Sequence, residues 1–319
     1  MISFRYHIVS IVSVFLALAV GVALGGGPLR GEVDNTLVEQ VEADRKAKAD
    51  LRAEVNDLGA GNEFTDGFAD GVAPRMLADT LDGRAVTILA LPGAQDPVLT
   101  SLADLVEVAG GTVASTVRAG EELIDVGNKQ LVDELASQLL TRAEDVTLPE
   151  EAGTYERIGA LLARAVATDQ DGGAAVDDEA SSILSGLSTA KLISPTDEGD
   201  RRGSLVIVVA GETTGEGADG SSAVVTSLVD SLDQATDGVV VTGPTAAARE
   251  GGVVAAVRTE VATADEASTV DMLDRKAGQV VTLMALAEQA GGKAGHYGSA
   301  DAGDGAMPGA PGAAEEPAG

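Results

Sequence analysis

The sequence has no cysteine, few aromatic residues and few cationic residues, and each shortage removes a class of function. Without cysteine, disulfide bonds, thiolate metal sites and cysteine nucleophiles are excluded. Aromatic residues make up 2% of the chain and tryptophan is absent, which argues against a self-contained outer-membrane barrel with its belts of Trp and Tyr. Lys and Arg number 21 against 51 Asp and Glu, for a formal net charge of -30. We therefore expect no nucleic-acid partner, because phosphate binding needs a clustered basic surface.

Histidine is also scarce, which bears on catalysis and metal binding. The chain has two histidines, His7 beside an N-terminal hydrophobic segment and His296 near the C-terminus, and neither is placed to orient a serine in a central sheet. No phosphate-binding glycine motif opens a helix after a strand. The residues therefore predict no enzyme and indicate no cofactor, although the many carboxylates leave an acid/base hydrolase open. With no Cys, no Met cluster and no His-x-His spacing, they do not identify a metal site.

An uncharged apolar run at 8–24 is long enough, with the glycines that follow, to cross a bilayer as a helix. The residues expected to anchor it in lipid are Ile8, Phe15, Leu16, Leu18 and Leu24. Arg5 precedes the run, so the positive-inside rule predicts a single-pass protein of the cell membrane with a cytoplasmic N-terminus and the main domain outside. A cleaved signal peptide is the alternative, because the small residues at 17–19 also suit a signal peptidase.

The charged segment that follows the apolar run carries apolar residues at alternating steps of four and three, the spacing of a coiled coil. This seam consists of Leu37, Val41, Leu51, Val55 and Leu58, with Asp44 and Lys48 in the two intervening core positions. We interpret 28–58 as a stalk that pairs two copies into a homo-oligomer. A lone, solvated amphipathic helix is the alternative.

Composition divides the remaining chain into a hinge, a domain and a tail. Four glycines within 59–71 predict a break in the helix, and Phe64 and Phe68 there are expected to pack against the domain. A final stretch of Gly, Ala, Pro and acidic residues lacks apolar material for packing. The expected organisation is an anchor at 1–27, a stalk at 28–58, a hinge at 59–83, an α/β domain at 84–290 and a disordered acidic tail at 291–319.

Between the hinge and the tail, short apolar runs alternate with segments of helical periodicity. Strands are expected at 85–91, 112–117, 204–210, 239–242 and 253–257, and helices at 97–109, 129–143, 155–167, 177–187, 221–234 and 271–289. Continuous apolar strands separated by helices indicate a parallel sheet that is covered on both faces. The predicted fold class is a doubly wound, mostly parallel α/β domain behind a transmembrane helix and a coiled-coil stalk.

Parallel sheets of this kind bind ligands beyond the carboxyl ends of their strands. The loops after Leu91 and Ala210 therefore hold the ligand candidates, which are Asp96, Glu212 and Thr213. Ordinary turn chemistry is the alternative explanation for these polar residues.

Several motifs resemble the actinobacterial MctB-type family of copper transport proteins. They are the opening residues 1–7 and 15–21, Ala-Gly-Gly-Thr-Val at 109–113, Ser-Thr-Val-Asp at 268–271 and Gly-His-Tyr-Gly at 295–298. The likeness runs nearly the whole chain up to Gly298, and its opening block is the most specific part.

The resemblance implies a role in copper homeostasis or efflux, as a channel component of the cell envelope, and it is the sole reason to consider copper. Related proteins also look like single-span, coiled-coil scaffolds that bind envelope partners controlling cell-wall hydrolysis or cell division. The stalk and soluble domain read from the residues fit this second implication better. An outer-membrane location, which the family description carries, fits the predicted single span less well.

Overall fold

The computed structural model describes residues 4–25, 29–143, 145–149, 151–195, 199–211 and 218–309. It divides the chain into two compact units, Met1–Phe64 and Thr65–Gly319. The first unit holds one helix and most of a second, and the second unit holds the end of that second helix and a mixed α/β fold.

Helix α1 (Phe4–Gly25) carries the apolar run. Its segment Arg5–Gly25 has 21 residues and a mean hydropathy of 2.6, and it is the one helix in the described part of the chain that is long and apolar enough to cross a membrane. At about 1.5 Å per residue its length matches the roughly 30 Å of a bilayer's hydrocarbon core. The predicted anchor residues Ile8, Phe15, Leu16, Leu18 and Leu24 are all exposed on it.

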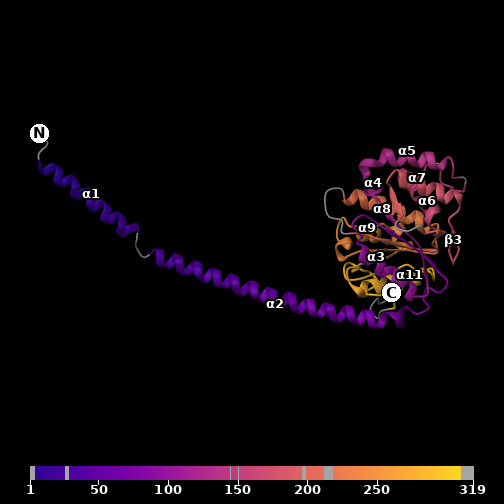
Figure 1. The fold of residues 1–319 in the computed structure, drawn as a ribbon, viewed down its shortest axis with the longest axis horizontal. Helices are drawn as coiled ribbons and strands as arrows, with labels where there is room; N and C mark the ends of the chain where they lie inside the picture. Colours follow the sequence, from indigo (N-terminus) through magenta and orange to yellow (C-terminus); the bar gives the residue numbers. More distant parts are fainter. Residues whose placement is uncertain are drawn as a thin grey trace, which may run out of the picture. The chain divides into compact units, whose positions relative to one another are not determined.

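The predicted break in the helix at 59–71 was wrong, because helix α2 (Leu29–Leu77) passes through these residues without interruption (Figure 1). Glycine inside a helix costs only about 1 kcal/mol relative to alanine. The later turns recover that cost by packing, since Ala69, Ala73 and Leu77 are buried. The expectation that the two phenylalanines pack against the domain was wrong, because Phe64 and Phe68 are both exposed.

The second unit is built on a seven-stranded sheet with the order β4-β2-β1-β6-β7-β8-β9. Its strands are β1 (Ala85–Ala90), β2 (Thr112–Ala119), β4 (Ile193–Pro195), β6 (Leu205–Val209), β7 (Val239–Thr242), β8 (Ser268–Val270) and β9 (His296–Tyr297). Neighbouring strands are parallel except at the β2–β4 edge. A separate pair, β3 (Ala174–Ala175) and β5 (Arg201–Arg202), is antiparallel.

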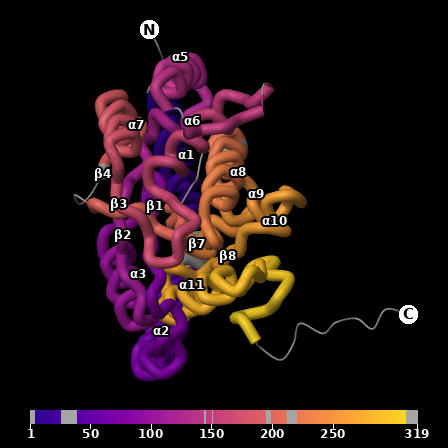
Figure 2. The backbone as a smooth tube through the Cα atoms, turned by 90° about the vertical axis from the view of Figure 1, so that its right-hand side faces the viewer, coloured from indigo at the N-terminus to yellow at the C-terminus, as the bar shows by residue number. Residues whose placement is uncertain are grey.

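Helices cover both faces of the sheet, as Figure 2 shows for α6 and α8 on one side and α3 and α11 on the other. One face packs against α4 (Glu121–Ile124), α5 (Lys129–Leu140), α6 (Thr154–Val166), α7 (Asp178–Thr189), α8 (Ala218–Asp233) and α9 (Val253–Thr259). The other face packs against α3 (Asp96–Val108), α11 (Lys276–Gln289) and the last turns of α2. The short helices η1 (Val126–Asn128), η2 (Thr245–Ala248) and α10 (Val261–Glu266) complete the unit. The predicted doubly wound, mostly parallel fold is confirmed.

The segment 253–257 was predicted as a strand and is instead the helix α9. Its valines favour a strand locally, but Val253, Val254 and Val257 are buried at helical spacing against the sheet. The sheet position belongs to β8, a short and mostly polar strand. The last helix accordingly begins at Lys276 rather than at Asp271.

The prediction of a disordered tail was wrong for 291–309, which the structure describes and which contains the strand β9. Strand β9 extends the sheet, with the Thr269 amide donating to the Gly295 carbonyl at 3.0 Å and the Asp271 amide to the Tyr297 carbonyl at 3.2 Å. Tyr297 is buried, which supplies the apolar contact that composition alone did not reveal. The rest of the predicted tail, 310–319, lies outside the described residues.

Candidate functional site

The carboxyl ends of the parallel strands meet at one edge of the sheet, where the order of connections changes direction between β1 and β6. The backbone leaves little room there, because a Cβ added to Gly211 would lie 2.4 Å from the carbonyl carbon of Gly93. A cavity of about 140 Å³ remains, lined by residues that include Gln95, Val98 and Leu273. The lining is mostly backbone and apolar side chains, so the described residues of this edge offer few groups that select a ligand.

Of the three predicted ligand residues, the structure describes only Asp96, and it gives that residue a structural role. Asp96 begins α3 and forms an ion pair with Arg118 of β2. The same guanidinium donates to the Ala94 carbonyl at 3.3 Å, so the pair fastens the loop after β1 to the neighbouring strand. Glu212 and Thr213 lie outside the described residues.

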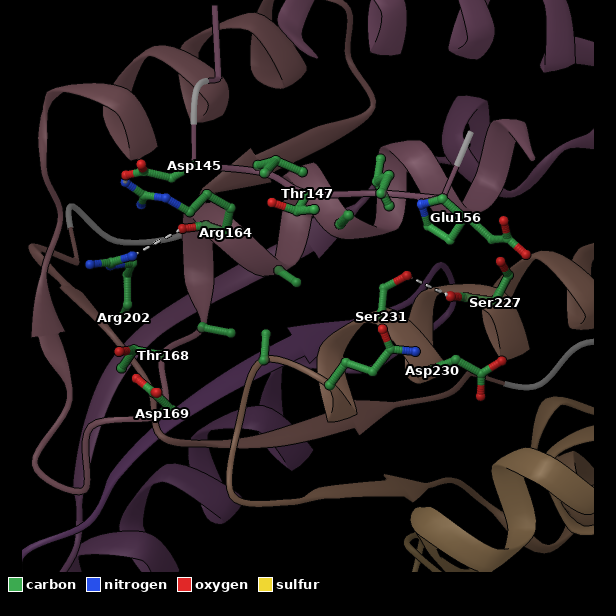
Figure 3. A pocket seen from close by; sticks show the side chains of 18 residues that line it. Asp145, Thr147, Glu156, Arg164, Thr168, Asp169, Arg202, Ser227, Asp230 and Ser231 are labelled. Atoms are coloured by element: carbon green, nitrogen blue, oxygen red, sulfur yellow. Dashed lines mark hydrogen bonds and ion pairs between the residues drawn. The ribbon is translucent and has the colours of Figure 1, made fainter. Parts of the chain in front are cut away.

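A larger groove lies over α6 and α8, with a volume of about 610 Å³. That volume is in the range of small-molecule sites. Arg164 and Arg202 lie toward one end, and Glu156 and Asp230 toward the other (Figure 3). No sequence pattern signals this groove, because its lining comes from 145–169, 202 and 227–235, which only the fold brings together.

Three carboxylates compensate the charges at the arginine end, because Arg164 also pairs with Asp145 at 3.7 Å and Glu179 at 3.6 Å. Arg164 and Arg202 share Asp177, at 2.9 Å and 3.4 Å. The Ala180 amide, followed by the Arg164 guanidinium, holds the pKa of Asp177 below its usual range. Nη1 of Arg164 and Nε of Arg202 are nevertheless buried without a hydrogen-bond partner in the described part of the protein. These two donors can bind a polar ligand atom or a water molecule.

At the carboxylate end, burial raises the pKa of Asp230, and the charges of Glu260 and Glu156 raise it further. No cation contributes to that shift. The groove thus presents donors at one end and a poorly compensated carboxylate at the other.

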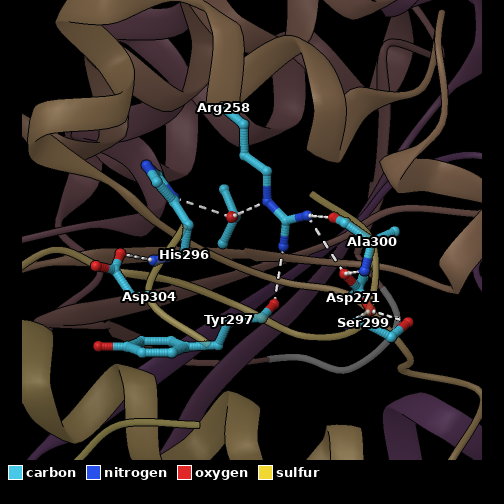
Figure 4. A network of polar contacts seen from close by, with 8 residues as sticks. Arg258, Asp271, His296, Tyr297, Ser299, Ala300 and Asp304 are labelled. Atoms are coloured by element: carbon cyan, nitrogen blue, oxygen red, sulfur yellow. Dashed lines mark hydrogen bonds and ion pairs between the residues drawn. The ribbon is translucent and has the colours of Figure 1, made fainter. Parts of the chain in front are cut away.

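A second polar cluster follows β8 and β9 at the carboxyl edge (Figure 4). The side chain of Asp271 is 0% exposed. Its carboxylate forms an ion pair with Nη1 of Arg258 at 3.3 Å. Its two carboxylate oxygens also accept from the amides of Ser299 at 2.8 Å and Ala300 at 3.0 Å. Arg258 donates in turn to the carbonyls of Tyr297, at 2.8 Å, and Ala300. Because these bonds satisfy the charges internally, the cluster fastens the C-terminal segment rather than forming an open ligand site.

The same arginine lies close to His296. Nε of Arg258 donates to the hydroxyl of Thr269 at 2.8 Å, and that hydroxyl lies 3.0 Å from Nδ1 of His296. A neutral ring with its hydrogen on Nε2 can accept the hydroxyl hydrogen of Thr269 at Nδ1. Burial, followed by the charge of Arg258, lowers the pKa of His296.

Among the residues that the structure describes, no three His, Cys, Asp or Glu side chains are grouped so that they could hold a metal ion. His296, the one histidine of the α/β unit, is engaged through Nδ1 by Thr269.

Comparison with known proteins gives a consistent result along the chain. The family described as "Copper transport outer membrane protein, MctB" matches residues 1–308. The "Copper transporter MctB" of Mycobacterium tuberculosis (strain ATCC 25618 / H37Rv) is 29% identical over 320 residues, covering 96% of this chain and 98% of that protein. The protein of the same name from Mycobacterium leprae (strain TN) is 27% identical over 318 residues, covering 93% and 96%. The chain therefore belongs to the MctB family.

Proposed function

We propose that this protein is a membrane-anchored component of copper homeostasis in the cell envelope. The observation that carries the proposal is the family match over residues 1–308, together with relatives named as copper transporters that align along nearly their whole length. Copper is the cargo in this proposal, and the chain acts without catalysing a reaction.

The anchor is α1, and the bilayer is its partner. Its apolar side chains are exposed around the whole helix, as in a helix that faces lipid. Arg5 at its start favours a cytoplasmic N-terminus with the α/β unit outside the cytoplasm. Cell fractionation combined with protease protection of intact cells tests both the anchor and its direction.

A copper measurement tests the function itself. Cells that lack the protein are expected to accumulate more copper than the parent strain, and the full chain should restore the parental level. A Leu16→Arg chain should fail to restore it, because a charge at mid-membrane costs about 2.5–3.5 kcal/mol on insertion scales. Leu16→Val is the matched control and should behave as the parent. Unchanged copper in the deletion strain would disprove the copper role.

The exposed apolar side chains of α2 favour a second candidate, a scaffold for envelope proteins that control cell-wall hydrolysis or division. This role predicts that deletion disturbs septation or sensitivity to muramidase while cell copper stays unchanged. A pull-down with the full chain from envelope extract would then recover the same division proteins with the parent chain but not with a Leu51→Lys chain.

A further inference from the structure

Helix α2 presents an apolar seam that no described residue of the chain covers. Val41, Leu51, Val55 and Leu58 are 47%, 61%, 65% and 62% exposed, respectively. Their spacing places Val41 and Val55 at the a positions of a heptad and Leu51 and Leu58 at the d positions. Large apolar side chains repeated on one face of a charged helix favour a helical partner with the same repeat.

Two charged residues interrupt the seam and decide which partner fits. Asp44 occupies a d position and Lys48 the following a position. In a parallel, in-register pair each core layer contains the same position from both helices, so Asp44 would face Asp44 and Lys48 would face Lys48. Two adjacent layers of like charges in the middle of the seam oppose this arrangement.

Antiparallel helices combine the layers differently, because a positions of one helix face d positions of the other. We propose that α2 pairs with α2 of a second copy in antiparallel orientation, with Asp44 opposite Lys48 of that copy and Val41 opposite its Leu51. Each contact occurs twice across the two-fold axis. Each of the two central layers then holds one Asp44–Lys48 ion pair. A Val41–Leu51 layer lies on either side of them.

The charges also select the register. Sliding one helix by a heptad in one direction places Asp44 against Val55 and Lys48 against Leu51, which buries two charges against apolar side chains. Sliding it the other way places Asp44 against Val41. Of the three antiparallel registers compared, only the first places Asp44 opposite Lys48 and Val41 opposite Leu51. Polar core residues in coiled coils are known to specify register and orientation at some cost in stability.

The pairing has a geometric consequence for anchored copies. Two copies anchored in one membrane can form the antiparallel pair when α2 lies along the membrane surface. A parallel pair, in contrast, can extend away from the membrane. The pairing is independent of copper and would hold even if the copper role were disproved.

The absence of native cysteine allows a direct test by disulfide crosslinking of the full chain in membranes. Differently tagged Val41→Cys and Leu51→Cys chains, expressed together and oxidised with diamide, are expected to form a mixed disulfide dimer. Leu51→Cys expressed alone should not crosslink, because position 51 faces position 41 of the other copy. Lys46→Cys, on the outer face of the helix, is the matched control and should not crosslink.

Crosslinking of Leu51→Cys alone would show a parallel pair and overturn the proposal, as would no crosslink in any combination. A charge exchange gives a second readout. Asp44→Lys in both chains should lower the mixed dimer by about fivefold or more, since the introduced lysine then faces Lys48 of the other copy. Adding Lys48→Asp should restore it, and an unchanged yield with Asp44→Lys would also contradict the proposal.

Discussion

The carboxylate of Asp66, on α2, accepts a hydrogen bond at 3.1 Å from the amide of Lys276, the first residue of α11. The N-cap position of α11, Arg275, provides no side-chain cap of its own, and its guanidinium pairs with the same carboxylate at 3.1 Å. A helix start is thus capped by a residue that lies 210 positions earlier in the sequence.

This contact predicts the effect of an Asp66→Ala substitution. Loss of a helix cap typically lowers the free energy of unfolding by about 0.5–2 kcal/mol, and we expect a value in that range. Asp66→Asn should retain part of the effect, because its amide oxygen can still accept. Urea denaturation measures the change, with the exposed Asp70→Ala as control. Equal stability of the Asp66→Ala and Asp70→Ala proteins would refute the role of the cap.

The Arg258–Asp271 pair predicts a larger loss. Asp271→Ala leaves the guanidinium of Arg258 buried without its charged partner, which typically costs about 3–5 kcal/mol. Hydrogen exchange should also show early loss of protection at 295–309, because the same carboxylate holds Ser299 and Ala300. The exposed Asp274→Ala is the matched control. Normal protection of that segment in Asp271→Ala would show that other contacts hold it.

Asp233 predicts a pH effect. Burial, with the neighbouring charges of Glu266 and Asp230, raises its pKa to about 6. The folded state then binds a proton more tightly than the unfolded state, so this contribution to stability is present below about pH 4 and is lost as the pH rises through 6. Asp233→Asn should therefore be more stable than the parent at pH 7.5, by about 1–2 kcal/mol after allowance for solvent screening.

The comparison for Asp233 is urea unfolding of parent and variant at pH 4.5 and 7.5. The advantage of Asp233→Asn should shrink at the lower pH, and Asp200→Asn, an exposed substitution, should show no such trend. An advantage of Asp233→Asn that is equal at both pH values would point to packing rather than titration.

The Thr269–His296 hydrogen bond predicts both a tautomer and an opposite pH trend. Nitrogen NMR of the ring should show the hydrogen on Nε2 at neutral pH. Because the pKa of His296 is lowered in the fold, its contribution to stability is present above the unfolded value near 6.5 and is lost as the pH falls through the folded value. Thr269→Val should raise the midpoint of the ring titration, whereas Thr259→Val, on an exposed helix face, should leave it unchanged.

The central strands were predictable because their residues are β-branched, apolar and buried on both sides. This holds for β1, β6 and β7, whose burial is continuous. The strands β8 and β9 were not predictable in this way. Each has only two or three residues, partly polar, and hydrogen bonds to distant segments define them.

Helix α2 shows the limit of glycine as a signal. The glycines at 59 to 71 lower helix propensity locally, yet packing of Ala69, Ala73 and Leu77 selects the helix. The coiled-coil pairing remains a prediction, because its partner lies outside a single chain. The groove over α6 and α8 could not be predicted, since Arg164, Arg202 and Asp230 have no common sequence pattern.

The two outer strands of the sheet carry a consequence for assembly. Strand β4 has three residues and ends in Pro195, which offers no amide hydrogen, and β9 has only two residues. Edge strands as short as these offer a neighbouring molecule few backbone groups for hydrogen bonding. Deleting the chain after Gly292 would remove β9 and leave β8, with three residues, as the new edge, and the backbone hydrogen bonds from Thr269 to Gly295 and from Asp271 to Tyr297 would be lost.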